Sequence, residues 1–249
     1  MNVVANDLMV NYQLSGKGKL VLLLHGWGDS AKGLSALANE LSKKYQVLSL
    51  DLPGFGASQA PTSVWDLDNY ANFLELFLNK VGVKQPYTVV GHSNGGALAI
   101  RAVNINKLKP QKLILLAASG IRTGQASKRL VLKVIAKAGN IATIWMPERY
   151  RRALRKSLYG AAGSDALVAP HLLETFKRTV RQDVQTDAAA LDVPTLLIYG
   201  KNDRAVPIAD GQKYHALIKN SKLEIIDSEH FVHQEQPEQV VKLIMEFLK

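Results

Sequence analysis

A serine between two glycines is the strongest chemical signal in this sequence. It lies in the pentapeptide Gly91-His92-Ser93-Asn94-Gly95, which follows the β-favouring run Thr88–Val90 and precedes a run of small and aliphatic residues. A strand that turns directly into a helix leaves no room for side chains beside the turning residue, and Gly91 and Gly95 remove those side chains. The pattern predicts that Ser93 lies on a strained turn, with its hydroxyl at a helix N-terminus where negative charge is stabilised.

A serine hydroxyl is a weak nucleophile at neutral pH unless a base accepts its proton and an acid orients the base. In open parallel sheets the reactive loops gather at the carboxyl ends of the strands. Suitable residues lie shortly after two later strand-like runs. Asp203 follows Thr195–Tyr199, and His230 follows Leu223–Asp227. The chain order Ser93, Asp203, His230 is one of three known for this kind of triad. We therefore expect a nucleophile, an acid and a base at these three positions.

Each of the two partners has an alternative. Asp227, at the end of the last predicted strand, could be the acid in place of Asp203. His233 lies three residues beyond His230 and could be the base. The spacing alone favours Asp203 and His230 and leaves both alternatives open.

The remaining histidines have structural interpretations. His25 and His92 lie in predicted loops or turns and are expected to organise them by hydrogen bonding. His171 and His215 are expected at the surface. Neither an HExxH motif nor a comparable ligand spacing occurs, so the sequence predicts no metal site and no cofactor.

The elements that must position these residues alternate between apolar runs and helical patterns. Such alternation predicts an α/β fold with a doubly wound, mostly parallel sheet, here of eight strands. The predicted strands are Val3–Ala5, Leu8–Leu14, Leu20–Leu24, Gln46–Leu50, Thr88–Val90, Lys112–Ala117, Thr195–Tyr199 and Leu223–Asp227. The predicted helices are Ala31–Ser42, Val64–Val81, Ala97–Asn106, Ile208–Ile218 and Glu238–Leu248.

Residues 122–186 interrupt the alternation with helical patterns and no clear strand. We interpret them as an inserted helical lid or cap on a core formed by residues 1–121 and 187–249. The insertion holds 13 Lys/Arg against 4 Asp/Glu, whereas the rest of the chain holds 18 against 17. Nearly all of the net charge of +10 therefore lies in the insertion.

The basic residues of the insertion fall into two clusters, which are Arg129, Lys133 and Lys137, and then Arg149, Arg151, Arg152, Arg155 and Lys156. The simplest interpretation is a pair of lid helices with solvated basic faces. Two functional interpretations remain open: attraction of an anionic acyl substrate, and transient contact with an acidic membrane surface. Binding of nucleic acid is disfavoured because the chain has no recognised motif for it and little aromatic interleaving among the basic residues.

The substrate-attraction interpretation makes a kinetic prediction. Reversing the charges of Arg151, Arg152 and Arg155 should raise KM for an anionic ester and leave KM for a neutral ester of similar size unchanged. Steady-state kinetics on the matched ester pair at low ionic strength would check this. Equal changes in both KM values would contradict attraction by charge.

Composition bounds the class of protein. Hydrophobic residues make up 47% and charged residues 21%, which is typical of a globular domain with a sizeable core and not of a disordered chain. The absence of cysteine excludes disulfides, a thiolate nucleophile and a cysteine-based metal site. Neither a signal peptide nor an apolar run long enough to span a bilayer is found, so a cytoplasmic protein is expected.

Several motifs together resemble those of the α/β-hydrolase-fold serine hydrolases. They are His25-Gly26-Trp27-Gly28, Asp51-Leu52-Pro53-Gly54-Phe55-Gly56, Gly91-His92-Ser93-Asn94-Gly95-Gly96, Tyr199-Gly200-Lys201-Asn202-Asp203, and His230 with Glu235-Gln236-Pro237-Glu238. The resemblance covers essentially the whole chain outside the insertion. It implies Ser93 as nucleophile, Asp203 as acid and His230 as base.

The resemblance also implies an oxyanion hole made by the backbone amides of Trp27 and Asn94. Asp51, Pro53, Gly54 and Gly56 are expected to set a structural turn beside the site. One departure is that relatives usually carry glycine just before the catalytic histidine, where this chain has Glu229.

These motifs specify the chemistry better than the substrate. A serine at the turn separates the chain from epoxide hydrolases and haloalkane dehalogenases, which use aspartate there. The leading expectation is hydrolysis of carboxylic esters of small to medium acyl groups through an acyl-enzyme. The alternatives are a C–C bond hydrolase, although Phe231-Val232-His233 lacks the tryptophan usual in that class, and a thioesterase. A non-enzymatic small-molecule receptor on the same scaffold is disfavoured because all three triad residue types are present.

Overall fold

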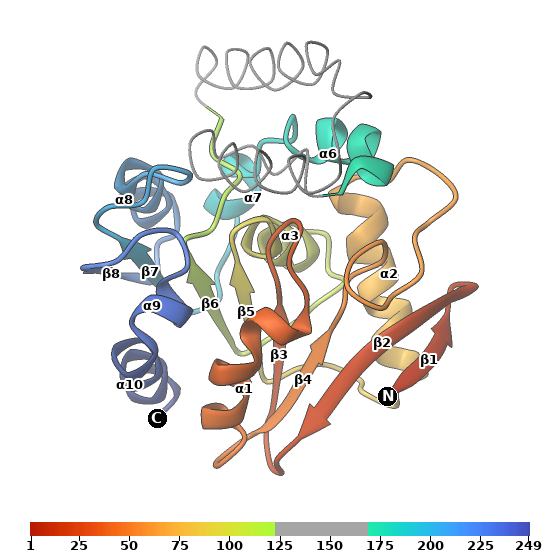
Figure 1. Ribbon diagram of the computed structural model, residues 1–249. Helices are drawn as coiled ribbons and strands as arrows, with labels where there is room; N and C mark the ends of the chain where they lie inside the picture. The colour runs from red at the N-terminus through yellow and green to blue at the C-terminus, as the bar shows by residue number, and fades with distance from the viewer. Residues whose placement is uncertain (123–168) are drawn as a thin grey trace, which may run out of the picture.

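The structure is a computed structural model that describes residues 1–122 and 169–249. Within these residues the strands form one sheet of eight, in the order β1-β2-β4-β3-β5-β6-β7-β8 (Figure 1). The strands are β1 Asn2–Ala5, β2 Leu8–Ser15, β3 Leu20–Leu24, β4 Gln46–Leu50, β5 Thr88–His92, β6 Lys112–Leu116, β7 Thr195–Gly200 and β8 Ser221–Ile226. Only the β1–β2 and β2–β4 pairs of this sheet are antiparallel. The predicted mostly parallel eight-stranded sheet is confirmed.

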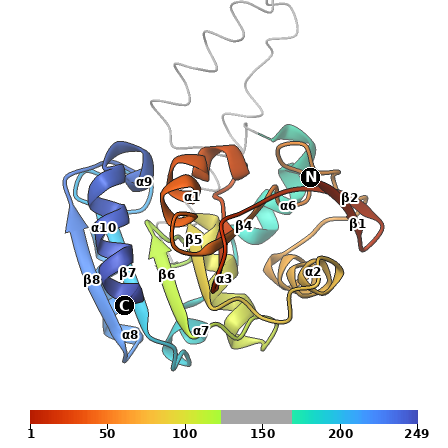
Figure 2. The same cartoon turned by 90° about the horizontal axis from the view of Figure 1, so that it is seen from below.

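The helices of the described residues cover both faces of the sheet. Their bounds are α1 Ser35–Leu41, α2 Leu67–Lys80, α3 Asn94–Asn104, α6 Leu173–Thr179, α7 Gln185–Ala189, α8 Ile208–Leu217, α9 Val232–Glu235 and α10 Pro237–Leu248, with 3₁₀ turns at Ala31–Leu34 and Pro170–Leu172. Helices α1 and α10 lie on one face, and α2, α3 and α8 lie on the other (Figure 2).

The core explains why the central strands read as continuous apolar runs. In β3, Val21 and Leu23 pack with α1 and α10, whereas Leu22 and Leu24 pack with α2 and α3. Side chains alternate between the two faces of a strand, so a strand covered by helices on both faces is apolar at every position. All five residues of β3 are buried.

The predicted helix boundaries differ from the observed ones where side chains cap the helices. Helix α2 begins at Leu67 and not at Val64, because Asp66 accepts a 3.0 Å hydrogen bond from the Asn69 amide while the Asn69 side chain accepts one from the Asp66 amide. This reciprocal pair is a capping box and ends the preceding loop. Helix α3 begins at Asn94, directly after Ser93, as the pentapeptide predicts, and it ends at Asn104, two residues before the predicted end at Asn106.

Most of the predicted insertion, including every basic residue of its two clusters, lies outside the described residues. Its described end contains α6 and the beginning of α7, and the predicted boundary after residue 186 falls inside α7. Helix α6 packs beside the loop that precedes α2, since the Thr175 hydroxyl oxygen accepts a 3.1 Å hydrogen bond from the Trp65 amide. Just beyond α6, the Gln182 side chain accepts a 2.7 Å bond from the Leu67 amide.

Helix α7 is attached to α3, the helix that follows Ser93, through one buried carboxylate. Asp187 accepts hydrogen bonds from Arg101 at 2.9 Å and from Asn104 at 2.6 Å, and its side chain is 8% exposed. Asp68, which pairs with the same arginine, is 41% exposed.

Asp187→Ala should therefore lower the free energy of unfolding by about 1.5–3 kcal/mol, because it removes the buried acceptor that Arg101 and Asn104 share and that attaches α7 to α3. Asp68→Ala, the matched control, should cost less than about 1 kcal/mol, since an exposed ion pair contributes little. Urea unfolding of the two variants measures the difference, and equal losses would contradict this account.

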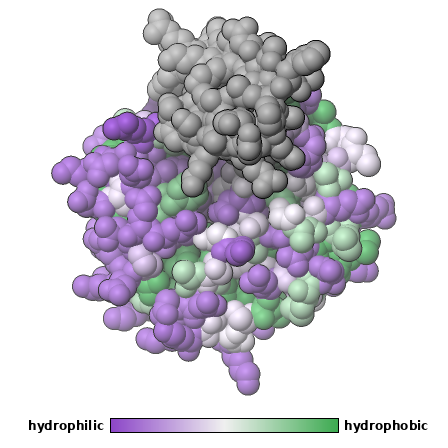
Figure 3. All heavy atoms as spheres, viewed as in Figure 1, coloured by the Kyte–Doolittle hydropathy of each residue, from purple (hydrophilic) through white to green (hydrophobic). Residues whose placement is uncertain are grey.

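The surface of the described residues is mixed. On the face shown in Figure 3, hydrophilic side chains are interspersed with small hydrophobic patches, as is common for a globular domain. Among residues 1–122 and 169–249, every helix is too short or too polar to cross a bilayer.

Candidate active site

Ser93 occupies the strained turn that its pentapeptide predicts. It lies between the end of β5 and the start of α3 with φ 51° and ψ −118°, a conformation that non-glycine residues rarely adopt. A Cβ atom on Gly91 would lie 2.5 Å from the Gly95 carbonyl oxygen, and one on Gly95 would lie 2.4 Å from that of Leu24. Both glycines are thus required for the close approach of strand, helix and neighbouring strand.

His230 and Asp203 are brought together by the loops that follow β8 and β7. The His230 Nδ1–H donates a 2.7 Å hydrogen bond to Asp203 Oδ2. The other carboxylate oxygen accepts bonds from the amides of Ala205 at 2.7 Å and Val206 at 2.8 Å, and the Asp203 side chain is fully buried. The carboxylate is therefore held from both sides, and in a neutral His230 ring the lone pair lies on Nε2.

The two alternative residues have other contacts. Asp227 is exposed and accepts a 2.9 Å hydrogen bond from the side chain of Asn202. His233 is buried in α9, and its ring centroid lies 4.7 Å from that of His92. Burial lowers the pKa of His233 to about 4, and its Nε2 lies 3.4 Å from the side-chain nitrogen of Gln234. Among the described residues, the carboxylate that pairs with a histidine is that of Asp203.

The loop that carries His230 is held by a residue that the sequence did not single out for this role. The Glu235 carboxylate, in α9, accepts hydrogen bonds from the amides of Glu229 at 2.6 Å and Phe231 at 3.1 Å. Glu229, which replaces the usual glycine, has an exposed side chain. The close approach is instead made at Gly200, where a Cβ would lie 2.1 Å from the Glu229 carbonyl oxygen.

His92 connects this loop to the nucleophile turn. Its Nε2–H donates a 3.1 Å hydrogen bond to the carbonyl oxygen of His230, and the two ring centroids lie 4.9 Å apart. Because His92 directly precedes Ser93, this bond places the loop of His230 beside the serine. Burial holds the pKa of His92 well below its usual range, so its ring is neutral at pH 7.

His25 organises a different loop, as predicted. Its Nε2 accepts a 2.9 Å hydrogen bond from the Leu52 amide, and its Nδ1–H donates a 2.7 Å bond to the Gly26 carbonyl oxygen. Burial lowers its pKa. The predicted surface positions of His171 and His215 are also observed.

The two amides assigned to an oxyanion hole belong to residues whose neighbours in the chain lie close to Ser93. Asn94 is the first residue of α3. Trp27 follows Gly26, at which a Cβ would lie 3.2 Å from the Cβ of Ser93. Neither amide donates a hydrogen bond to another residue in the described parts of the chain. Their role in an oxyanion hole stays a prediction.

The indole of Trp27 belongs to a buried aromatic group beside the site. Its ring centroid lies 4.8 Å from that of Phe55 and 5.1 Å from that of Phe176 in α6. All three side chains are buried. They form part of the hydrophobic core next to the residue whose amide is assigned to the oxyanion hole.

Asp51 has the structural role expected of it. Its carboxylate accepts hydrogen bonds from the amides of Ala31 at 2.7 Å and Ala57 at 2.9 Å, and a Cβ on Gly56 would collide with it. At Gly54 a Cβ would lie 2.5 Å from the side chain of Leu172, just before α6. These residues shape the turn between β4 and the site.

The sequence over residues 21–243 matches the alpha/beta hydrolase family. The chain belongs to this family. This alpha/beta hydrolase is 27% identical over 259 residues to the uncharacterized hydrolase YugF of Bacillus subtilis (strain 168), with 96% of this chain and 93% of the relative covered. It is 26% identical over 271 residues to a 2-hydroxy-6-oxo-2,4-heptadienoate hydrolase of Pseudomonas putida, with 99% and 95% covered.

Solved structures agree on the fold. The alpha/beta hydrolase superposes on a thermophilic esterase from Thermogutta terrifontis with a TM-score of 0.77 at 22% identity, covering 100% of this chain and 97% of the esterase. The predicted fold class and the predicted enzyme class are thus confirmed at the level of the family.

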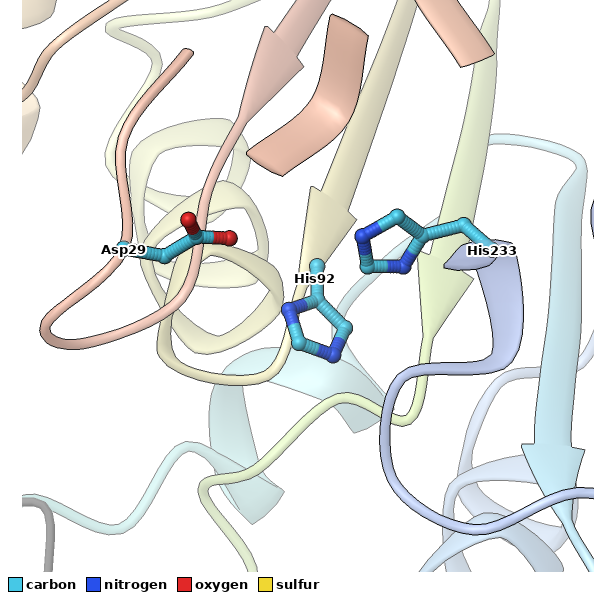
Figure 4. A group of neighbouring side chains, drawn as sticks. All are labelled: Asp29, His92 and His233. Atoms are coloured by element: carbon cyan, nitrogen blue, oxygen red, sulfur yellow. The ribbon is translucent and has the colours of Figure 1, made fainter. Parts of the chain in front are cut away.

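The structure of this alpha/beta hydrolase also gathers residues that the sequence left apart. Asp29, His92 and His233 each have one potential ligand atom, and these atoms lie within 4.8 Å of one another (Figure 4). No pattern of short-range spacing could have revealed this group, because its members come from the loop after β3, the end of β5 and α9.

Proposed function

We propose that this alpha/beta hydrolase is a serine esterase that cleaves carboxylic esters of small to medium acyl groups. The proposal is supported by the hydrogen bond between His230 and Asp203, and by the position of Ser93 on a turn with positive φ at the end of β5. A serine with a base and an orienting acid is the arrangement that activates an alcohol for attack on a carbonyl carbon.

The reaction follows from these positions. His230 Nε2 takes the Ser93 proton as the hydroxyl oxygen attacks the ester carbonyl, and the amides of Trp27 and Asn94 donate to the resulting oxyanion. The C–O bond then breaks, and the alcohol leaves with the proton held by His230. Water attacks the acyl-enzyme in the same way and releases the carboxylic acid.

The aromatic group of Trp27, Phe55 and Phe176 supports an apolar acyl group, because aromatic side chains next to the oxyanion hole favour burial of hydrocarbon.

A second candidate is hydrolysis of a C–C bond in a dienoic keto acid. It is favoured by the 26% identity to the Pseudomonas putida heptadienoate hydrolase and would use the same triad. Thioester hydrolysis uses the same acyl-enzyme chemistry. The basic insertion is compatible with all three reactions. It would attract an anionic substrate or contact an acidic membrane surface in each case.

The test combines labelling with a substrate panel. A fluorophosphonate probe should modify Ser93, identified by peptide mass spectrometry, and the enzyme should hydrolyse p-nitrophenyl acetate and butyrate with higher kcat/KM than an acyl thioester or a dienoic keto acid. Labelling of Ser93 without ester turnover would move the assignment to the thioester or the C–C substrate, whichever is cleaved. Absence of labelling in folded protein would contradict the serine hydrolase and favour a receptor.

A further inference from the structure

The loop that carries His230 contains two peptide groups that are hydrogen-bonded at both edges. In the first group, the Ser228 carbonyl oxygen accepts a 2.9 Å bond from the Asn202 amide. The Glu229 amide of the same peptide group donates a 2.6 Å bond to Glu235 Oε2. One edge of this group is therefore attached to the loop after β7 and the other edge to α9.

The second peptide group directly follows His230. The His230 carbonyl oxygen accepts a 3.1 Å hydrogen bond from His92 Nε2–H, at the end of β5. The Phe231 amide, on the other edge of the group, donates a 3.1 Å bond to Glu235 Oε1. The two oxygens of one carboxylate thus hold the amide edges of both peptide groups.

The carbonyl edges lead to the other two members of the proposed triad. Asn202 directly precedes Asp203, and His92 directly precedes Ser93. Hydrogen bonds to an ionised acceptor are stronger than neutral ones, and a peptide group whose N–H is bound in this way becomes a better acceptor at its carbonyl oxygen. The Glu235 carboxylate therefore strengthens the contacts of the loop with both turns.

Glu235 is itself fixed by the segment that it holds. It is the last residue of α9, and its amide donates a 2.9 Å hydrogen bond to the Phe231 carbonyl oxygen. Phe231 is the residue before α9 and has no side chain that could cap the helix. The Glu235 carboxylate reaches back to the Phe231 amide, as the acidic residue of a capping box does. Two bonds in opposite directions thus join these residues.

We propose that Glu235 is a positioning residue for His230. This inference rests on the proposed function, in which His230 Nε2 accepts the Ser93 proton. Glu235 acts through the two peptide groups, which fix the backbone of His230 relative to the turns of Ser93 and Asp203. Because misplacing a catalytic group by about 1 Å can cost about 100-fold in rate, loss of the carboxylate should lower kcat and leave KM unchanged.

Glu235→Gln tests whether both carboxylate oxygens are needed. A carboxamide has one acceptor oxygen, so its NH₂ group must face the amide of either Glu229 or Phe231, which also donates. The variant should lower kcat for p-nitrophenyl butyrate about 10-fold, and Glu235→Ala, which loses both bonds, about 100-fold, with KM within about twofold. Fluorophosphonate labelling of Ser93 should slow by the same factors. Should Glu235→Ala fail to fold, Glu235→Gln decides alone.

Glu229→Gln is the matched control. It also removes a carboxylate next to His230, but the Glu229 side chain is exposed and makes no recorded hydrogen bond among the described residues. It should keep wild-type kcat within about twofold. A second control places Glu235→Gln in the His230→Gln background, where it should leave the residual rate unchanged because the base that it positions is gone.

A measurement without substrate separates this inference from the proposed function. The His230 Nδ1–H, which donates to Asp203, should give a far-downfield proton NMR resonance, assigned by its loss in His230→Gln. Glu235→Gln should shift or broaden this resonance, and Glu229→Gln should not. If the wild type hydrolysed no ester, the esterase proposal would fail and the resonance would decide on Glu235. A resonance unchanged in Glu235→Gln, an unchanged kcat in the active enzyme, or a loss that multiplies with that of His230→Gln would overturn the positioning role.

Discussion

Replacing Ser93 by alanine should lower kcat for p-nitrophenyl butyrate by about 10⁵- to 10⁶-fold, with KM changed little. The alcohol oxygen is the atom that forms the acyl-enzyme, so without it only the oxyanion donors and substrate binding act on the attack of water. The strained turn at φ 51° is a backbone feature held by Gly91 and Gly95, and the substitution leaves it in place. The variant should therefore remain folded.

Ser119→Ala is the matched control, because the Ser119 amide donates to the Ser93 carbonyl oxygen while its hydroxyl makes no recorded bond among the described residues. It should retain wild-type kcat within about twofold. Kinetics are measured on samples purified separately from wild-type enzyme, so that trace contamination does not set the residual rate. A Ser93→Ala variant that keeps more than a hundredth of wild-type kcat would contradict the assignment.

The same reasoning predicts the effect on kcat of replacing His230, alone or together with Ser93. His230→Gln should cost about as much as Ser93→Ala, and the double variant should be no slower than either, because nucleophile and base act as a unit. Losses that multiply in the double variant would mean that the two residues act independently. If His233→Gln abolished turnover while His230→Gln did not, the base would be His233.

The fold and the proposed triad could be predicted because each rests on local signals. A buried strand such as Leu20–Leu24 is apolar at every position, and the Gly91–Gly95 spacing describes a turn that only glycine permits. The carboxyl ends of parallel strands lie at one edge of the sheet, so the chain order predicts that the residues after β7 and β8 lie at the same edge as Ser93.

The missed features depend on contacts between elements that are distant in the chain. The group of Asp29, His92 and His233 appears only when the β3 loop, the β5 end and α9 are packed together. The sequence alone indicates a loop residue at position 92 and an alternative base at position 233, with no relation between the two. Their rings in fact contact each other, and a sequence pattern carries no information about that distance. The Glu235 contact with the His230 loop was missed for the same reason.

Asp203→Asn should lower kcat by about 10³- to 10⁴-fold while the fold is kept. The loss arises because the ring proton of His230 moves from Nδ1 to Nε2. Asp203 Oδ1 accepts hydrogen bonds from the Ala205 and Val206 amides. In the variant the carboxamide oxygen must take that position, because an NH₂ group there would face two N–H donors. The NH₂ group then faces His230 Nδ1.

An NH₂ group can only donate, so Nδ1 becomes the acceptor and the ring proton moves to Nε2. The nitrogen that should take the Ser93 proton is then already protonated, and the base is lost although every heavy atom stays in place. Burst kinetics with p-nitrophenyl butyrate should show slower acylation, and fluorophosphonate labelling of Ser93 should slow in proportion.

Asp227→Asn is the matched control, since its carboxylate is exposed and contacts Asn202 instead of a histidine. It should change kcat by less than about twofold. Asp203→Ala separates the two roles of the buried carboxylate: it removes the orienting group without fixing the wrong tautomer, and it leaves the Ala205 and Val206 amides without their acceptor. We therefore expect it to be less stable than Asp203→Asn yet no slower in acylation. If Asp227→Asn were the inactive variant and Asp203→Asn the active one, the His230–Asp203 hydrogen bond would be structural and the acid would lie at the end of β8.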